Sequence, residues 1–406
     1  MPPAVQFDDI LTARARIADG VLATPCSESP ALSSLCSCTV FSKREYLQRT
    51  GSFKERGARN ALLQLSPDQK RQGVIAASAG NHALALAYHG LDLGIPVTVV
   101  MPVFAPLVKQ ERCRQYGARV VLSGGNIGEA KEEADRLAGS GGLSYVHGFD
   151  DPAVVAGAGT VGLEILEQVP DVESIVVPVG GAGLIAGLGL AVKTMRPGVE
   201  VVGVEPTRAA SYTAALEASA PATVAMEPTL GDGLAVPTVG PRAFDLAREV
   251  VDRVVCVDEE AIALAILRLL ELEKGVVEGA GATPLAALLS GKLPDLCSKK
   301  VVLVLAGGNI DPGVLGRVIE YGLVADGRLS QFRASISDRP GGLATLAQQI
   351  AANGASVKQI THERAFAEPD VSKVEVQCIV ETRGHDHLER LLASLESAGV
   401  RILAHS

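Results

Sequence analysis

The feature that most constrains the fold is a run of six apolar segments, rich in β-branched residues, that each end in glycine or a turn. They cover residues 73–80, 95–102, 118–125, 174–183, 199–206 and 299–309. Such nearly continuous apolar runs are typical of parallel strands buried on both faces. The segments between them, such as 81–90 and 160–169, show helical spacing. The alternation predicts a doubly wound α/β fold, whose ligands bind at the carboxyl ends of the strands.

The pattern changes after about Gly327. Residues 332–360 predict a strand, a tight turn, a helix and a second strand, and residues 373–382, 387–399 and 400–406 predict a strand, a helix and a last short strand. The order βαββαβ is that of a ferredoxin-like module. We therefore expect two domains, residues 1–325 and 326–406, with a smaller subdomain at roughly 49–150 inserted in the first.

Charge and composition exclude several classes of function. The 406 residues carry 37 basic and 46 acidic side chains, a formal net charge of −9, and no basic block stands out. Nucleic acid and anionic membranes are therefore not expected as partners. No apolar run is long enough to span a bilayer, and the first ten residues lack the features of a signal peptide. The seven scattered cysteines indicate reduced thiols in a cytoplasmic protein.

The segment TGSFKERG, residues 50–57, places Lys54 in a loop bounded by two glycines. A lysine in an apolar pocket favours its neutral form, and a neutral amine can attack a carbonyl to form a Schiff base. An isolated lysine is more often a solvated surface charge. The interpretation therefore depends on whether other parts of a cofactor site are present.

Three further segments supply such parts. Residues 179–184 follow a predicted strand and open a helix, so that their N–H groups can converge on an anion, and they match neither the dinucleotide fingerprint nor the P-loop. Residues 78–82 offer a hydroxyl, an amide and N–H groups to a carboxylate, although ordinary helix capping would also explain them. Residues 306–309 end another strand. An amine, a phosphate cradle, a carboxylate site and a strand end to meet an aromatic ring together indicate pyridoxal phosphate. His385 and His387 are interpreted as a solvated turn.

Specific motifs then show a family resemblance. TGSFKERGA, SAGNHA, FDDPAVVAGAGTVGLEI, PVGGAGLIAG, GVEP, VVEGAGA and LAGGNID resemble those of threonine dehydratases (threonine ammonia-lyases), which are pyridoxal phosphate enzymes of fold type II, the tryptophan-synthase-β-like fold. The tail, with SDRPGGLATL, resembles an ACT domain, an amino-acid-sensing module. The resemblance covers nearly the whole chain. It implies a catalytic domain over 1–325 and a regulatory domain over 326–406.

The resemblance implies roles for individual residues. Lys54 would hold the cofactor covalently and move the substrate α-proton, and Ser78 would assist it. The cofactor would be bound by Phe53, Lys54, Asn81, Gly180, Gly181, Ala182, Gly183, Leu184 and Ala306. The substrate carboxylate would be held by Ser78, Gly80, Asn81 and His82. Glu205 and the carbonyl group of Ala209 match a site for a monovalent or divalent cation in some relatives.

Six positions depart from the family pattern, and of these Leu84 and Tyr46 have no assigned consequence. Ala306 stands where Ser or Cys commonly bonds the cofactor's ring nitrogen, so that we expect this nitrogen to be bonded by water or left bare. Ala182 replaces a glycine, which is tolerable if its φ is negative. Ser211 stands where a carboxylate often completes the cation site, which argues against tight Mg²⁺ or Ca²⁺ binding. Racemases of this group carry a serine where this chain has Ala79, so that elimination should dominate over inversion.

The expected reaction converts L-threonine to 2-oxobutanoate and ammonia, and L-serine to pyruvate. Three alternatives stay open: an ammonia-lyase for another β-hydroxy amino acid such as 3-hydroxyaspartate, a serine or aspartate racemase, and a non-catalytic amino-acid sensor. In the tail, the N–H groups of Gly341, Gly342 and Leu343 open a helix and can receive the carboxylate of an effector, for which isoleucine and valine are the first candidates. Because ACT modules usually pair, we expect a homodimer or homotetramer.

Overall fold

The computed structural model describes residues 5–363 and 372–405. Contacts divide the chain into two compact units, residues 1–312 and 313–406. Each unit has its own sheets and hydrophobic core. The two units are therefore described separately.

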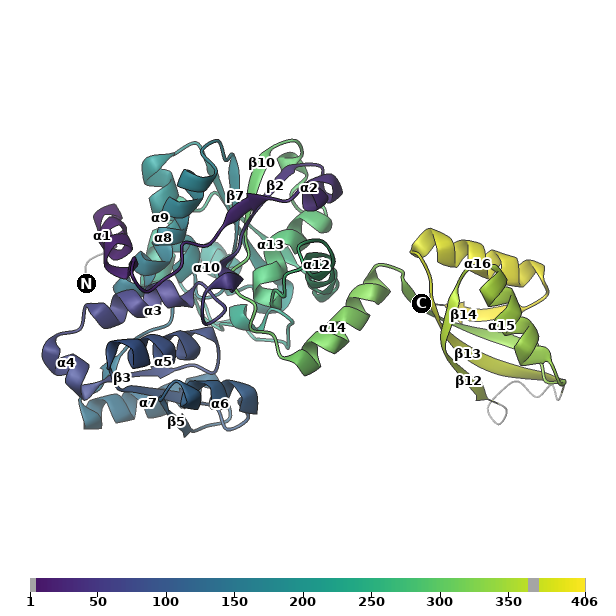
Figure 1. Cartoon of the computed structure of the whole chain (residues 1–406), viewed down its shortest axis with the longest axis horizontal. Coiled ribbons are helices and arrows are strands. Elements are labelled where there is room, and N and C mark those ends of the chain that lie inside the picture. Colours follow the sequence, from purple (N-terminus) through teal and green to yellow (C-terminus); the bar gives the residue numbers. More distant parts are fainter. Residues whose placement is uncertain (1–4, 364–371, 406) are drawn as a thin grey trace. The chain divides into compact units, whose positions relative to one another are not determined.

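A six-stranded sheet forms the centre of the first unit (Figure 1). Its order is β1 (Cys26–Glu28), β2 (Thr39–Lys43), β10 (Lys300–Val304), β7 (Ser174–Pro178), β8 (Glu200–Pro206) and β9 (Arg253–Val257). All neighbours pair in parallel except β1 and β2. Most residues of β7, β8 and β10 are buried, as expected for parallel strands covered on both faces.

Helices cover both faces of this sheet. One layer holds α1 (Phe7–Ile17), α8 (Pro152–Gln168), α9 (Gly183–Met195) and α11 (Pro241–Val250), which pack on one another. The other holds α2 (Pro30–Cys36), α12 (Glu259–Leu272) and α13 (Gly279–Leu289). The short α10 (Ser211–Ala218) contacts α11. These two layers bury the strands and confirm the doubly wound architecture.

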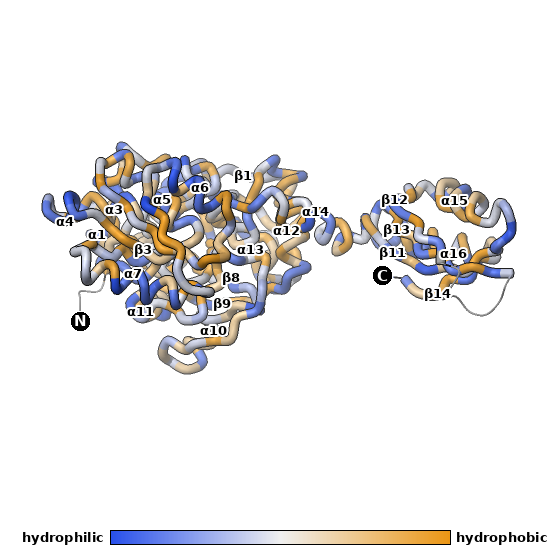
Figure 2. The backbone as a smooth tube through the Cα atoms, turned by 90° about the horizontal axis from the view of Figure 1, so that it is seen from below, coloured by the Kyte–Doolittle hydropathy of each residue, from blue (hydrophilic) through white to orange (hydrophobic). Residues whose placement is uncertain are grey.

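A second, four-stranded parallel sheet lies within residues 74–145, in the order β5 (Arg119–Leu122), β4 (Val97–Met101), β3 (Val74–Ala77) and β6 (Ser144–Tyr145). The helices α3 (Lys54–Leu63), α5 (Asn81–Leu93) and α6 (Leu107–Gln115) pack on one side, and α7 (Ile127–Gly141) on the other. In Figure 2 the stretch around β3 is hydrophobic, whereas α4 (Pro67–Gln72) at the rim is hydrophilic. This smaller body falls in the range predicted for the inserted subdomain, and α3 joins it to α8.

The second unit contains a four-stranded antiparallel sheet in the order β12 (Ser356–Glu363), β13 (Lys373–Glu381), β11 (Leu329–Ser337) and β14 (Arg401–His405). Two helices, α15 (Gly342–Ala352) and α16 (His385–Ser397), follow β11 and β13 along the chain and pack into one core with the sheet. The order βαββαβ is the one predicted from the sequence.

Helix α14 (Pro312–Ala325) groups with the second unit, whereas the predicted domain boundary at 325/326 placed it in the first. Within the second unit, Lys358 Nζ lies 2.7 Å from a carboxylate oxygen of Glu320 on α14. Among the described residues, no helix is long and apolar enough to cross a membrane.

Candidate active site

Two loops that follow β2 and β10 are joined along their length. The Phe53 N–H donates to Ala306 O at 3.0 Å, Gly308 N–H donates to Gly51 O at 2.9 Å, and Ser52 and Gly307 form an isolated bridge. Gly51 has a φ of +80°, and a Cβ there would come within 2.7 Å of Asn309. Since both loops start at the carboxyl ends of parallel strands, they place Phe53 and Ala306 side by side.

Lys54 was expected in a loop, but it is the first residue of α3. The turn bonds that Glu55 N–H and Arg56 N–H donate to Ser52 O and Phe53 O lead directly into the helix, which explains the difference. Lys54 Nζ donates to Gly148 O at 2.6 Å and lies 5.0 Å from the centroid of the Phe53 ring. Burial lowers the pKa of the Lys54 amine to about 8, although the Glu278 carboxyl group acts in the opposite direction. A substantial neutral fraction near physiological pH follows.

Lys54 reaches the glycine-rich loop through residues 148 and 149. The ring of Phe149 lies over Gly181, where a Cβ would come within 2.2 Å of it, and a Cβ on Gly183 would come within 2.3 Å of Phe149 O. Glycine is therefore required in this loop by the approach of Phe149 as well as by any ligand. Gly148 and Phe149 had been assigned no role from the sequence, although the FDDP motif contains Phe149.

Ala182 does not have the negative φ that we expected. Its φ is +68°, in the left-handed region, and it is the N-cap residue of α9. Ala182 O accepts the first helical bond from Ala186 N–H at 3.0 Å, so the left-handed residue lies directly at the start of the helix. The loop residues Gly181, Gly183 and Leu184 are buried around it. The loop thus keeps its helix N-terminus at the cost of a strained alanine.

Asn81 is the first residue of α5, and both the nitrogen and the oxygen of its side-chain amide form hydrogen bonds. Asn81 Nδ2 donates to Glu278 Oε1 at 2.6 Å, and Asn81 Oδ1 accepts from Asn309 Nδ2 at 2.9 Å. Burial, followed by the charge of Asp232, raises the pKa of Glu278 to about 7. Glu278 lies against Gly307, next to Ala306. It was missed in the sequence reasoning, although VVEGAGA contains it.

His82 lies close to the Lys54 amine. Its Nε2 lies 3.0 Å from Val146 O, which must accept a hydrogen, so that Nδ1 is the unprotonated nitrogen of the neutral ring. Nδ1 is buried without a partner among the described residues. Burial and the charge of Lys54 lower the pKa of His82 to about 3. Ser78 and Gly80 are both partly exposed in the turn before α5, and Gly80 N–H donates to Ser78 Oγ at 3.3 Å.

The predicted cation ligand Glu205 is engaged by protein donors. Its carboxylate accepts from Tyr212 N–H at 2.7 Å and from Thr213 N–H at 2.8 Å, and so caps α10. Thr213 Oγ1 adds a third bond at 2.6 Å. Ala209 is buried in the turn before this helix. Among the described residues, no group of three or more His, Cys, Asp or Glu side chains could hold a metal ion.

The interpretation of His385 and His387 as a solvated turn is wrong for the second residue. Both lie in the first turn of α16. His387 is buried, accepts a hydrogen bond from Arg383 N–H at 3.0 Å, and has Nε2 at 2.8 Å from Asn353 O. It therefore tethers the helix start to the end of α15, which local sequence periodicity does not reveal.

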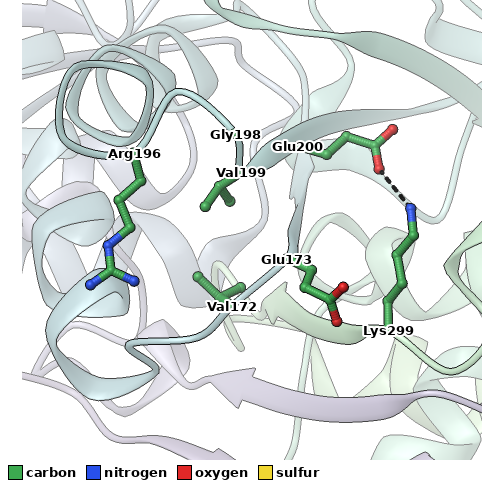
Figure 3. A pocket seen from close by; sticks show the side chains of 7 residues that line it. All are labelled: Val172, Glu173, Arg196, Gly198, Val199, Glu200 and Lys299. Carbon is green, nitrogen blue, oxygen red and sulfur yellow. Dashed lines mark ion pairs between the residues drawn. The ribbon is translucent and has the colours of Figure 1, made fainter.

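A hollow of about 560 Å³ lies elsewhere in the first unit (Figure 3). It is lined by Val172, Glu173, Arg196, Gly198, Val199, Glu200 and Lys299. These residues lie at or before the starts of β7, β8 and β10, the edge opposite to the loops described above. Glu200 and Lys299 form a long ion pair at 3.9 Å. Its lining contains none of the residues predicted to act on a cofactor or substrate. We therefore place the candidate site at the carboxyl ends of the parallel strands.

The residues at the carboxyl ends fit pyridoxal phosphate. The Lys54 amine has a lowered pKa, and the buried glycine loop opens a helix N-terminus. His82 Nδ1 and Ser52 Oγ are buried polar atoms that find no partner within residues 5–363 and 372–405. A phosphate group suits the first helical N–H groups, which have no partner within the helix. Ala306 brings no polar side chain to the site, as the sequence indicated. The residues predicted to bind the cofactor lie after the carboxyl ends of β2, β3, β7 and β10, in the loops or at the starts of the helices that follow.

Comparisons with known proteins show the family to which the chain belongs. Residues 17–307 match the family described as "Pyridoxal-phosphate dependent enzyme". The chain is 43% identical over 398 residues to an L-threonine ammonia-lyase of Thermotoga maritima, covering 98% of this chain and 99% of the relative. The structure of threonine deaminase isoform 2 from Solanum lycopersicum is 34% identical with a TM-score of 0.73, covering 79% of this chain and 95% of that one. A maize serine racemase is also 34% identical, with a TM-score of 0.75 and coverages of 79% and 99%. The chain is a member of the pyridoxal-phosphate dependent enzyme family.

Proposed function

We propose that this chain is an L-threonine ammonia-lyase that releases 2-oxobutanoate and ammonia, and that also converts L-serine to pyruvate. The observation that carries the proposal is the Lys54 amine, which has a pKa lowered to about 8 beside the glycine loop. The named relative from Thermotoga maritima, similar over nearly its whole length, supports threonine as the substrate. 3-Hydroxyaspartate is the runner-up among β-hydroxy amino acids.

The residues would divide the work as follows. The first N–H groups of α9 and its loop, residues 180–184, would bind the cofactor phosphate, and Asn81 would donate to the oxygen on its ring. Ser78, Gly80 and His82 would hold the substrate carboxylate. When bound, pyridoxal phosphate supplies an electron sink for negative charge at the substrate Cα. Lys54 would hold the cofactor, take the Cα proton when freed, and keep it near the leaving hydroxyl.

Racemisation is the rival reaction, because a serine racemase has the same fold. Returning a proton to the opposite face of Cα requires a second acid. Ala79 stands at the position expected to supply it, and its side chain packs against the core of the smaller sheet. Elimination is therefore favoured over inversion.

The test measures 2-oxo acid release from L-threonine, L-serine and 3-hydroxyaspartate by the purified protein loaded with pyridoxal phosphate. We expect L-threonine to be the best substrate, with no D-enantiomer formed. Lys54→Ala should abolish both turnover and the visible absorption of covalently held cofactor. Full activity of that variant would overturn the role of Lys54, and absorption without ammonia from any substrate would favour the sensor alternative.

We also propose that the second unit is an ACT-like regulatory domain. It contains a cavity of about 420 Å³, whose lining includes Ser337, Arg339, Gly342 and Thr345. Gly342 begins α15, so the cavity meets a helix N-terminus, where a carboxylate would be stabilised. Gly341 and Leu343 flank that residue. Isoleucine or valine should therefore change threonine turnover, and Arg339→Gln should weaken that response more than it changes KM.

Two further proposals concern ions and assembly. Because Glu205 already accepts three hydrogen bonds, we propose that it binds no divalent cation tightly, and that chelation leaves activity unchanged. A monovalent cation is the ion that remains to be tested at Glu205.

For a domain of this type we propose a homodimer or homotetramer, which light scattering would measure. We also propose that the protein acts in the cytoplasm.

A further inference from the structure

Glu55 follows Lys54 in the first turn of α3, and its side chain is fully buried. One carboxylate oxygen, Oε1, accepts a hydrogen bond from the Thr50 N–H, at the start of the turn that presents Phe53 and Lys54. The carbonyl group of the same residue, Thr50 O, accepts from Asn309 Nδ2 at 2.6 Å. The peptide units around Thr50 are therefore fixed from both sides by side chains.

The second oxygen, Glu55 Oε2, faces a buried histidine. It lies 3.4 Å from His89 Nε2, and both side chains are fully shielded from solvent. Neither atom makes a hydrogen bond with a described residue, each other included, so the two groups form a close buried contact at ion-pair distance. A buried carboxylate and a buried imidazole that face only each other depend on each other, because either would be left without a partner if the other were removed.

Arg59 sets the orientation of the histidine. Arg59 Nη1 lies 3.3 Å from His89 Nδ1, and an arginine can only donate. His89 Nδ1 therefore accepts, which leaves the hydrogen of the neutral ring on Nε2, the nitrogen that lies closest to the Glu55 carboxylate. Arg59 is itself held by Asp92 at 2.6 Å and by Asp19 at 3.0 Å, both on the surface.

These contacts connect the helices that carry the reaction centre. Glu55 and Arg59 lie on α3, which begins with Lys54, and His89 lies on α5, which begins with Asn81. We propose that Glu55 is a positioning residue for Lys54: its carboxyl group fixes the Thr50 turn, and His89, oriented by Arg59, fixes that carboxyl group. This inference rests on the role proposed above for Lys54.

The experiment follows capture of pyridoxal 5′-phosphate by the full-length apo-protein, measured as the rate at which the visible absorption band of covalently held cofactor develops. The variants are Glu55→Gln, His89→Leu and the double variant. Glutamine keeps an acceptor for Thr50 N–H but turns an N–H₂ group toward His89 Nε2–H. We expect each single variant to slow capture about tenfold, and the double variant to be no slower than the singles, since the two residues act as one unit.

Two controls separate the possible outcomes. Lys54→Ala should show no band at all, and a band in that variant would overturn the role of Lys54 rather than that of Glu55. Leu86→Ala, at a fully buried position on the same helix as His89, should lower the unfolding temperature without slowing capture. In steady state, the Glu55 and His89 variants should lower kcat with KM nearly unchanged. The proposal would be overturned if Glu55→Gln captured the cofactor at the wild-type rate, or if the double variant were slowed about a hundredfold, the product of the two single effects. If Glu55→Gln does not fold, the capture rate of His89→Leu decides the question alone.

Discussion

Helix α3 contributes one residue to each of two buried polar regions, Lys54 to one and Arg56 to the other. The pKa values of the two regions shift in opposite ways. The charge cluster, formed by Lys43, Glu45, Arg56 and Glu164, pairs two cations with two anions. The reaction centre, formed by Lys54, His82 and Glu278, lacks such pairing. Burial alone would lower the pKa of Arg56 and raise that of Glu45, but their mutual attraction outweighs it and shifts both pKa values toward the charged forms.

In the reaction centre, burial wins. It lowers the pKa of Lys54 to about 8 and that of His82 to about 3, and it raises the pKa of Glu278 to about 7. All three shifts favour the neutral form. In this fold, buried groups that are paired stay charged and hold α3 in place, whereas buried groups without such pairing shift toward their neutral forms.

The largest expected effect comes from breaking the charge cluster. Arg56 donates to both oxygens of Glu45 at 2.8 Å and to both oxygens of Glu164. Arg56→Met should lower the free energy of unfolding by about 3–5 kcal/mol, because it leaves two carboxylates without their main partner. Denaturant unfolding of the apo-protein measures this change.

The matched control is Arg14→Met. Arg14 also makes two hydrogen bonds to one carboxylate, that of Glu167, but both side chains are about half exposed. We expect a loss of about 0–1 kcal/mol there. A comparable loss at both positions would mean that burial does not distinguish the two pairs.

The second effect tests the opposite behaviour of Glu278. A carboxyl group whose pKa is raised on folding binds its proton more tightly in the folded protein than in the unfolded chain. Its stabilising contribution is complete below about pH 4.5 and is lost as the pH rises through about 7. The free-energy difference between the wild type and Glu278→Gln should therefore fall by about 3 kcal/mol across that window.

Glutamine keeps an acceptor for Asn81 Nδ2, so the comparison isolates the titration. The measurement is denaturant unfolding of both apo-proteins at several pH values. A difference that does not change with pH between about 4.5 and 7 would contradict the raised pKa of Glu278.

Much of the fold followed from local pattern, because buried parallel strands such as β7 and β10 are apolar in sequence. The charge cluster did not. Lys43 lies in β2 and looks like a solvated charge, but its buried amine is paired with Glu164, 121 residues later, and also donates to Thr24 O. Likewise Glu278 and Asn81 meet across 197 residues. Local spacing identified the lysine and the glycine loop, whereas partners that come from distant segments depend on the folded arrangement.

The third effect concerns the amine itself. The pKa of Lys54, lowered by burial, predicts that the rate of cofactor capture by the apo-protein rises with pH and levels off above about 8. Below that midpoint the neutral fraction, and with it the rate, should fall about tenfold per pH unit. Stopped-flow absorbance between pH 6 and 10 measures this. A rate that still rises tenfold between pH 9 and 10 would place the amine with ordinary solvated lysines.

The smallest effect lies in the glycine loop, where strain rather than charge is at stake. Ala182 has a φ of +68°, which an L-residue with a Cβ adopts at a cost of about 1–2 kcal/mol. Ala182→Gly removes that strain but gives the unfolded chain more freedom, which costs about 0.4–1 kcal/mol. We therefore expect a net stabilisation of about 0.5–1 kcal/mol. Ala186→Gly, one turn later in α9 with ordinary helical geometry, should instead destabilise by about 1 kcal/mol. Opposite signs at these two alanines would establish that the loop stores strain beside the phosphate cradle, while equal losses would show that the left-handed turn is cheaper than its geometry implies.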